Sequence, residues 1–254
     1  KTEDSKRVAY VPSYTCGTVL APYVKAGFRL KFYEVDRSMT PVWEDQALGE
    51  ISVLNLCGYY GFSRYDRAFV QKCRERGICI LEDSTHSILS LDGISPDADY
   101  ITGSLRKWIG VPSGGFLIKR RGKLTPELLP FHQEHLDMRR GAMETKKKST
   151  TEPGSVSQEA LEAAEATFWQ AESLLRQIFD CCQSDPDSVQ IMRRFPVERI
   201  RNLRRENYQR LLSVFPKSPL CVPVFPLLDE ATVPSHFTVL AQRRNDLQSF
   251  LKEQ

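Results

Sequence analysis

The stretch that decides the fold is RVAYVPSYTCGTVLAPYVKAGFRLKFYEVD, residues 7–36. It begins with an apolar run that ends at Pro12, and it continues with apolar residues at helical spacing as far as Gly27. It closes with RLKFYEVD, a segment typical of a strand. A strand, a helix and a second strand in this order favour an α/β domain with a mainly parallel sheet.

The same alternation continues to about residue 120. ISVLNLCG predicts a strand, RYDRAFVQKCRERG a helix that ends at Gly77, and ICILEDS, ADYITGS and GGFLIKR three more strands. Ligands of such sheets bind beyond the carboxyl ends of the strands. Four polar loops follow predicted strands, namely PSYTCGT, NLCGYYG, EDSTHS and GSLRKW, and we expect them to converge on one edge of the sheet.

The pattern changes beyond residue 120. RRGAMETKKKSTTEPGS is expected to be a mobile loop or linker, with KKK as a solvated run and not a phosphate clamp. SQEALEAAEATFWQAESLLRQIFDCC and PVERIRNLRRENYQRLLSVF predict helices, and SHFTVLAQRRNDLQSFLKEQ predicts a strand and an amphipathic helix. We therefore expect a large α/β domain over residues 1–150, and a helical segment with part of a small α+β domain over residues 151–254.

Composition excludes several classes of protein. The 254 residues are 41% hydrophobic and 26% charged, as in an ordinary globular protein, and the net charge of +3 does not argue for nucleic acid. No apolar run approaches the ~20 residues that span a bilayer, and the first residues lack the apolar core of a signal peptide. The seven scattered cysteines contain no CxxC pair, so neither zinc nor a disulfide framework is favoured. A cytoplasmic protein without nucleic-acid or membrane partners is the expectation.

The segment ICILEDSTHS places two carboxylates at the end of an apolar strand. Glu82 and Asp83 close the strand, and His86 follows three residues after Asp83. One interpretation is a strand end that caps the next helix. The other is that Asp83 holds a positive charge on a partner, with His86 close by. A metal site is disfavoured because one aspartate and one histidine lack further spaced ligands.

Lys107 lies in GSLRKWIGVPSGG, residues 103–115, after the next predicted strand. If both loops lie at the same edge, Asp83 and Lys107 share one cavity, either as a plain salt bridge or as the minimum of a pyridoxal phosphate site. In such a site the lysine amine condenses with the cofactor aldehyde, and partial burial beside Trp108 would favour the required neutral amine. The aspartate pairs with the pyridine nitrogen, and Ser104 offers a hydroxyl for the phosphate.

These segments resemble the DegT/DnrJ/EryC1/StrS family of pyridoxal-phosphate-dependent sugar aminotransferases, which have fold type I. SLRKWIGVPSGGFLI, ILEDSTHSI and YVPSYTCGTVLAPYVKAGFRLKFYEVD follow the family's order over residues 8–120. VPSHFTVLAQRRNDLQSFLKEQ resembles the strand and helix of its small C-terminal domain. The resemblance implies that Lys107 is the Schiff-base lysine and Asp83 the pyridinium partner. His86 then lies near the cofactor ring oxygen, and Ser104 contacts the phosphate.

The chain departs from the family at two positions and at both ends. Cys16 stands where the family commonly has an aromatic residue stacked on the cofactor, so either Tyr14 supplies that ring or the stacking is absent. Asn55, a candidate substrate contact, stands where the family often has histidine. The family also has a Gly-rich helix start that binds the phosphate, which would precede these residues, and it continues past their end. The sequence is therefore expected to be an incomplete member.

The activity implied by the resemblance is the transfer of an amino group to a keto-sugar nucleotide, with glutamate as the expected donor. Lys107 would act as general base and acid in each half-reaction, and the enzyme is expected to be a homodimer. Dehydration of the sugar at C3 is the enzymatic alternative, but that subgroup replaces the lysine with histidine. A different class is a binding or assembly module that keeps the fold and has lost catalysis.

Other candidate sites are weaker. His132 and His135 of FHQEH are interpreted as surface histidines, because a third metal ligand is missing. GYYG lacks the further glycine and helix of a dinucleotide-binding loop. Ser13 could be combined with His86 and Asp83 as a hydrolase triad, but it does not lie in a G-x-S-x-G turn.

Overall fold

The chain forms two compact units. The structure is a computed structural model, and it describes residues 7–180 and 182–253. Unit 1 comprises Lys1–Gly103, Leu117–Arg121 and Pro196–Gln254, and unit 2 comprises Ser104–Phe116 and Gly122–Phe195. The expected division into domains 1–150 and 151–254 stays a prediction.

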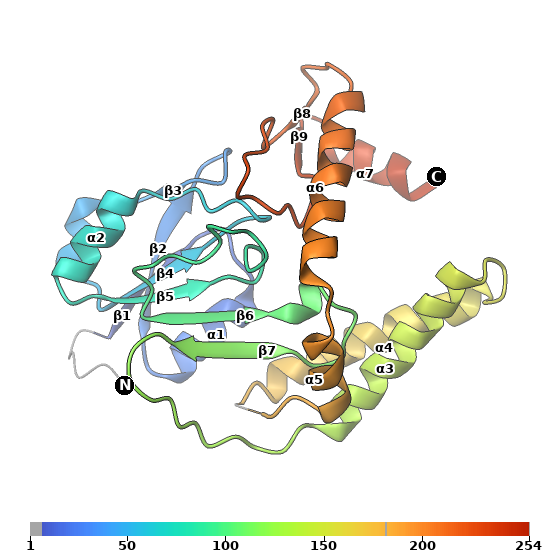
Figure 1. The fold of residues 1–254 in the computed structure, drawn as a ribbon, viewed down its shortest axis with the longest axis horizontal. Helices are drawn as coiled ribbons and strands as arrows, with labels where there is room; N and C mark the ends of the chain where they lie inside the picture. The colour runs from blue at the N-terminus through green and yellow to red at the C-terminus, as the bar shows by residue number, and fades with distance from the viewer. Residues whose placement is uncertain (1–6, 181, 254) are drawn as a thin grey trace. The chain divides into compact units, whose positions relative to one another are not determined.

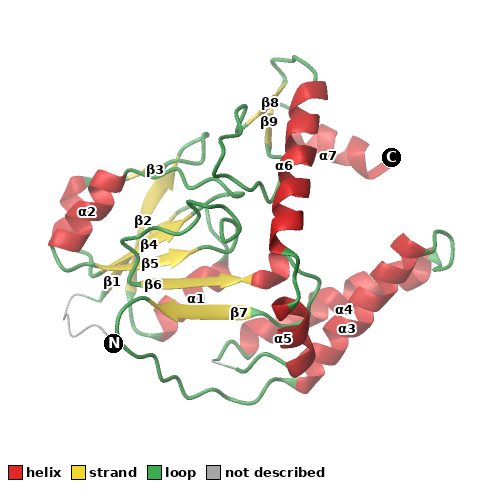
Figure 2. Cartoon of the chain, in the orientation of Figure 1, coloured by secondary structure: helices red, strands yellow, loops and turns green. Residues whose placement is uncertain are grey.

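The sheet of unit 1 is mainly parallel (Figures 1 and 2). Its strands follow one another in the spatial order β3 (Pro41–Val42), β2 (Arg29–Val35), β1 (Val8–Pro12), β4 (Val53–Cys57), β5 (Cys79–Asp83), β6 (Tyr100–Ser104) and β7 (Gly115–Lys119). Strands β2, β1, β4, β5 and β6 pair in parallel, and β3 pairs with β2 in the antiparallel sense. The chain leaves β1 toward β2 and returns on the other side of β1 as β4, so the strand order reverses between β1 and β4.

Continuous apolar runs form the interior of this sheet. Every residue of β1 is buried, and Leu54, Leu56 and Ile80 in β4 and β5 are fully inaccessible. Strands buried on both faces read as unbroken apolar runs, which is why the sequence predicted them. The strand predictions for β1, β2, β4, β5, β6 and β7 are confirmed.

Short helices connect the strands, as the sequence predicted. Helix α1 (Gly17–Lys25) follows β1, and α2 (Arg67–Glu75) follows β4. Both end just before a glycine with positive φ, Gly27 at 78° and Gly77 at 70°, where a side chain would be strained. At the other end of α2 the carboxylate of Asp66 accepts a hydrogen bond of 2.8 Å from the backbone N–H of Ala68 and caps the helix. A 3-10 helix, η1 (Asp45–Gly49), precedes β4.

The last part of the chain also belongs to unit 1. Helix α6 (Val197–Val214), strands β8 (Cys221–Pro223) and β9 (Val239–Ala241), and helix α7 (Arg244–Glu253) follow in this order, with β8 and β9 antiparallel. Phe62, after β4, stacks on Phe225 with ring centroids 3.8 Å apart, and Tyr208 of α6 packs beside Phe62. The predicted helix at α6 and the predicted strand and helix at β9 and α7 are confirmed.

Unit 2 is mainly helical. It contains η2 (Leu105–Lys107), α3 (Gln133–Thr151), α4 (Gln158–Gln177) and α5 (Pro186–Arg193), and α3 packs along α4. The helix predicted at α4 is confirmed, and its N-terminus is capped by Ser157.

The prediction that RRGAMETKKKSTTEPGS is a loop or linker is wrong, because α3 continues through it to Thr151. Helix α3 buries His135, Leu136, Arg139 and Ala142, which share one face, and two of these four are polar. The interpretation of His135 as a surface residue is therefore also wrong, since its side chain is 6% exposed.

Arg139 explains how a polar residue is accommodated there. Its guanidinium forms an ion pair with Glu172 of α4 and lies 4.7 Å from the centroid of the Phe168 ring. A charged group at such a position hides the helical pattern from a search for apolar residues. Among the described residues, no helix is both long and apolar enough to cross a membrane.

Candidate functional site

The strand order reverses between β1 and β4, so the loops that follow these two strands are the expected place for a ligand site. In open parallel sheets, ligands bind outside the carboxyl ends of the strands at such a reversal. The loop after β1 carries Tyr14 and Cys16, the loop after β4 carries Tyr59 and Tyr60, and β5 ends at Asp83. The structure thus brings three of the four predicted polar loops to one edge within unit 1.

Aromatic side chains from distant segments meet at this edge. The ring of His86 is stacked on that of Tyr60, with centroids 5.5 Å apart and planes at 16°. The ring of His236, from the segment before β9, lies 5.5 Å from Tyr60 and 5.7 Å from His86. Tyr14 joins the group through its hydroxyl, which lies 3.0 Å from the hydroxyl of Tyr60. We call Tyr14, Tyr60, His86 and His236 the ring cluster.

The backbone after β4 is arranged to bring Tyr60 to His236. Tyr60 has a φ of 57°, a left-handed conformation that is costly for a bulky residue and is found preferentially at functional sites. Gly61 follows with a φ of 104°, and a Cβ there would lie 2.2 Å from the carbonyl oxygen of Val233. Only glycine permits this approach, which lets the N–H of Ser235 donate to the Tyr60 carbonyl at 2.8 Å.

Asp83 lies at the carboxyl end of β5, opposite Thr102 of β6. Its side chain is partly buried, and its Oδ1 accepts a hydrogen bond of 2.9 Å from the N–H of Thr85. This Asx turn fixes the carboxylate and leaves the second oxygen able to accept another hydrogen bond. This acceptor oxygen fits a protonated heterocyclic nitrogen, which donates one hydrogen bond. The expected cap of a following helix is replaced by this turn, since no helix begins there among the described residues.

Glu82, the neighbour of Asp83, lies inside the protein and not at the candidate site. Its side chain is fully buried and accepts hydrogen bonds from the N–H of Ser95 at 2.7 Å and from the hydroxyl of Tyr65 at 3.2 Å. Burial raises the pKa of this carboxyl group to about 7, although the two hydrogen bonds lower it in part. Glu82 is thus a buried acid behind the site, with its side chain on the opposite face of β5 from Asp83.

Asn55 and Cys16 take positions that the sequence did not anticipate. Asn55 is 1% exposed, and its side-chain amide donates to the hydroxyl of Tyr23 in α1 at 2.9 Å. Cys16 is exposed, and its sulfur lies 2.8 Å from the hydroxyl of Thr18 at the start of α1. Their roles toward substrate and cofactor stay predictions.

Lys107 and Ser104 belong to unit 2. Ser104 ends β6, and its hydroxyl accepts a hydrogen bond of 3.3 Å from Nε of Arg106. Lys107 is the last residue of η2, and its side chain is exposed, whereas Trp108 beside it is buried. The expected partial burial of Lys107 is therefore wrong. Its exposure leaves the amine accessible to a ligand.

Sequence reasoning missed two members of the ring cluster, Tyr60 and His236. Tyr60 lies in NLCGYYG, one of the four loops expected at this edge, but the sequence assigned no role to its tyrosines. The glycines flanking the two tyrosines were the available signal for a close backbone approach. His236 had no local signal, because its neighbours in space come from segments far away in the chain.

Comparisons with known proteins agree on the fold. No protein-family model matches the sequence, and no curated protein matches it either. Among solved structures, S. venezuelae DesV in complex with a ketimine intermediate is similar, with 15% identity and a TM-score of 0.53 over 98% of this chain and 61% of that chain. Helicobacter pylori PseC, an aminotransferase involved in the biosynthesis of pseudoaminic acid, has 14% identity and a TM-score of 0.53 over 100% of this chain and 65% of that chain.

A third solved structure has the same fold. The sphingosine-1-phosphate lyase of Burkholderia pseudomallei is 12% identical, with a TM-score of 0.53 over 97% of this chain and 54% of that chain. The predicted fold class is confirmed: it is fold type I of the pyridoxal-phosphate-dependent transferases, with a mainly parallel sheet flanked by helices. The chain spans between 54% and 65% of the length of these three proteins.

Proposed function

We propose that the protein is a pyridoxal-phosphate-dependent aminotransferase that attaches the cofactor through Lys107. The observation that carries the proposal is the Asp83 carboxylate, which is fixed at the carboxyl end of a fold type I sheet with one oxygen able to accept a further hydrogen bond. Thr102 lies opposite Asp83 in the next strand, and Lys107 follows Thr102 shortly afterwards in the chain. When bound, the cofactor would supply an electron sink for the carbanion formed at the amino donor.

The residues of the chain would have distinct roles. Asp83 would accept the hydrogen bond of the protonated ring nitrogen and favour its positive charge. His86 would lie beside the cofactor ring, and Tyr14 would contribute an aromatic surface in place of the residue that Cys16 replaces. Ser104 would donate to the phosphate. Once its amine is free, Lys107 would take up and release a proton, and it would thus act as the general base and acid of the reaction.

The finer assignment is a keto-sugar nucleotide as amino acceptor and glutamate as donor. It is supported by the resemblance of the strand-end segments to sugar aminotransferases and by the likeness in fold to PseC and DesV. A homodimer in the cytoplasm belongs to the same proposal. Mass spectrometry of a reaction with glutamate and a keto-sugar nucleotide tests the substrates, because transfer forms 2-oxoglutarate and an amino sugar in equal amounts.

The first test is the attachment of the cofactor. Pyridoxal phosphate added to the purified chain should produce a visible absorption band, and borohydride reduction should leave a pyridoxyl group on the peptide that contains Lys107. Lys107→Ala should lose both signals, and Lys217→Ala, which changes an exposed lysine of unit 1, should keep them. Asp83→Asn should weaken cofactor retention about tenfold, since a charge-assisted hydrogen bond is lost.

A chain that takes up no cofactor, or that carries the pyridoxyl group on other lysines to the same extent, would contradict the proposal. It would favour the alternative of a binding or assembly module that keeps the fold without the chemistry. A chain that binds the cofactor through Lys107 but transfers no amino group to sugar nucleotides would contradict only the substrate assignment.

A further inference from the structure

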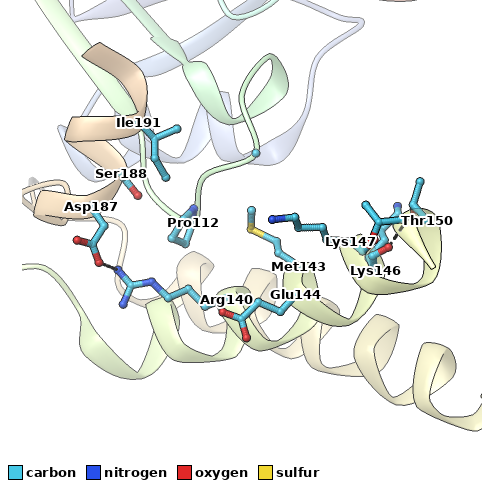
Figure 3. A pocket seen from close by; sticks show the side chains of 12 residues that line it. Pro112, Arg140, Met143, Glu144, Lys146, Lys147, Thr150, Asp187, Ser188 and Ile191 are labelled. Atoms are coloured by element: carbon cyan, nitrogen blue, oxygen red, sulfur yellow. Dashed lines mark hydrogen bonds and ion pairs between the residues drawn. The ribbon is translucent and has the colours of Figure 1, made fainter. Parts of the chain in front are cut away.

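Unit 2 contains a cavity that none of the predicted site residues lines. It has a volume of about 580 Å³ and lies between α3, α5 and the loop of Gly110 and Pro112 (Figure 3). Cavities that bind small molecules have volumes of roughly 300–1,000 Å³. The cavity is thus large enough for a ligand of two or three rings.

Polar contacts around the buried carboxylate of Asp185 hold one end of the cavity in place. Arg140 of α3 donates to Asp185 at 2.7 Å and to Asp187 at 3.1 Å, which ties α3 to the start of α5. The side chain of Asp185 is 2% exposed, accepts a hydrogen bond of 2.7 Å from the Ser113 hydroxyl and caps α5 through the N–H of Ser188. These contacts connect all three walls, so the cavity is formed before any ligand binds.

Apolar side chains supply the surface between the walls. Met143 of α3 and Ile191 of α5 line the cavity together with Pro112, and Ile191 is 47% exposed. Methionine adapts its shape to flat or irregular apolar groups. An aromatic ring bound here would remove these side chains from water. This surface therefore favours a ligand with an apolar, planar group.

The other end of the cavity is positively charged. Lys146 and Lys147 line it, and neither ammonium lies within ion-pair distance of a carboxylate in the part of the chain that the structure describes. Arg140 at the far end is paired with both Asp185 and Asp187, and Glu144 offsets one of the two lysines, so the positive charge of the lining is concentrated at Lys146 and Lys147. Lysine ammoniums at the rim of an apolar cavity complement a sulfonate, phosphate or carboxylate.

We infer that this cavity binds a small amphipathic anion, with an aromatic body against Met143 and Ile191 and its acidic group at Lys146 and Lys147. Such a ligand would also contact Gly110 and Pro112, which follow Lys107 in the chain. It would therefore lie against the segment that carries the proposed cofactor lysine. The inference stands on unit 2 alone and does not depend on the proposed reaction.

The probe for this inference is 8-anilinonaphthalene-1-sulfonate, an aromatic anion that fluoresces when it leaves water. Titration of the purified chain at low ionic strength should give saturable binding at one site. The double variant Lys146→Glu/Lys147→Glu should weaken that binding about tenfold or more, because both charges that face the sulfonate are reversed. Lys148→Glu is the matched control, since this lysine lies on the same helix outside the cavity lining and should leave the affinity within about twofold.

A second variant and a second probe separate the apolar contact from the charge. Ile191→Ser, which keeps every charge and lies on α5, should weaken binding about fivefold. N-phenyl-1-naphthylamine, the same body without the sulfonate, should bind at least about tenfold more weakly than the anion. Circular dichroism verifies that each variant is folded. Equal losses in Lys148→Glu and the double variant, unsaturable binding, or equal affinity for the neutral probe would overturn the inference.

Discussion

Unit 1 and unit 2 are stabilised by different kinds of contact. The strands of unit 1 bury continuous apolar runs, with Leu54, Leu56 and Ile80 fully inaccessible to water. The helix pair of unit 2 buries charged and titratable side chains, with Arg139 of α3 paired to Glu172 of α4. The difference teaches that the interior of the sheet depends mainly on buried apolar area, whereas the contact of α3 with α4 also includes a paired charge. Each unit should therefore respond to a different perturbation.

The two units also bury titratable groups of opposite kind. In unit 1, burial raises the pKa of Glu82 to about 7, so the folded unit holds this proton more tightly than the unfolded chain does. In unit 2, burial and, to a lesser extent, the charges of Arg139 and Arg106 lower the pKa of His135 to about 4, so this folded unit binds the proton less tightly. The stabilities of the two units should therefore change with pH in opposite directions.

The largest effect is expected from the apolar interior of unit 1. Leu54→Ala leaves a cavity in a strand that is buried on both faces, and it should lower the free energy of unfolding by about 3 kcal/mol. Leu227→Ala is the matched control, because Leu227 is 77% exposed and the same change should be nearly neutral. Denaturant unfolding measures both variants. Equal effects of the two would contradict the apolar basis of this unit.

The pH dependence of unit 1 tests the role of Glu82. Its pKa is raised on folding from 4.5 to about 7, so the stability of the folded state falls as pH rises through this window, by up to about 3 kcal/mol. Glu82→Gln keeps the hydrogen-bonding shape without the charge, and should be more stable than the parent above pH ~7. Hydrogen exchange of peptides from β4 and β5, measured between pH ~5 and ~8, follows unit 1 specifically. A variant with the same pH slope as the parent would exclude Glu82 as the cause.

A smaller effect of opposite sign is expected from His135 in unit 2. Its pKa is lowered on folding from 6.5 to about 4, so the stability contribution is present above pH 6.5 and is lost as pH falls toward about 4. At pH ~5, the lower end of the range used for Glu82, the loss should amount to about 2 kcal/mol, and it should be absent in His135→Gln. Hydrogen exchange of α3 and α4 peptides measures it in the same experiment. Parallel pH slopes in both units would refute the contrast between them.

The sequence indicated much of the fold but less of the candidate site. The strands of unit 1 could be predicted because buried parallel strands are continuous apolar runs, and α1 and α2 because glycine stops each helix. Asp83 and Lys107 could be singled out because they follow strands whose carboxyl ends share an edge. The exposure of Lys107 and the interior position of Asn55 could not be predicted, since burial depends on residues outside the segment.

Helix α3 shows why the second half of the chain was harder to predict. Its buried face contains His135 and Arg139, and in the sequence it reads as polar and basic. The helix becomes recognisable only when α4 places Glu172 and Phe168 against that face. A charge that is neutralised by a partner from another element carries no local sign of its burial.

The sequence by itself determined the order of the main strands of unit 1 and of the helices between them, because apolar runs, helical spacing and terminal glycines act over a few residues. It also determined which carboxylate and which lysine follow adjacent strands. The tertiary structure alone decided the ring cluster, in which the backbone at Tyr60 and Gly61 lies against Val233–Ser235 and sets His236 beside His86. Side chains so far apart in sequence are brought together by packing and by backbone hydrogen bonds between distant segments, and no local pattern of residues encodes such contacts.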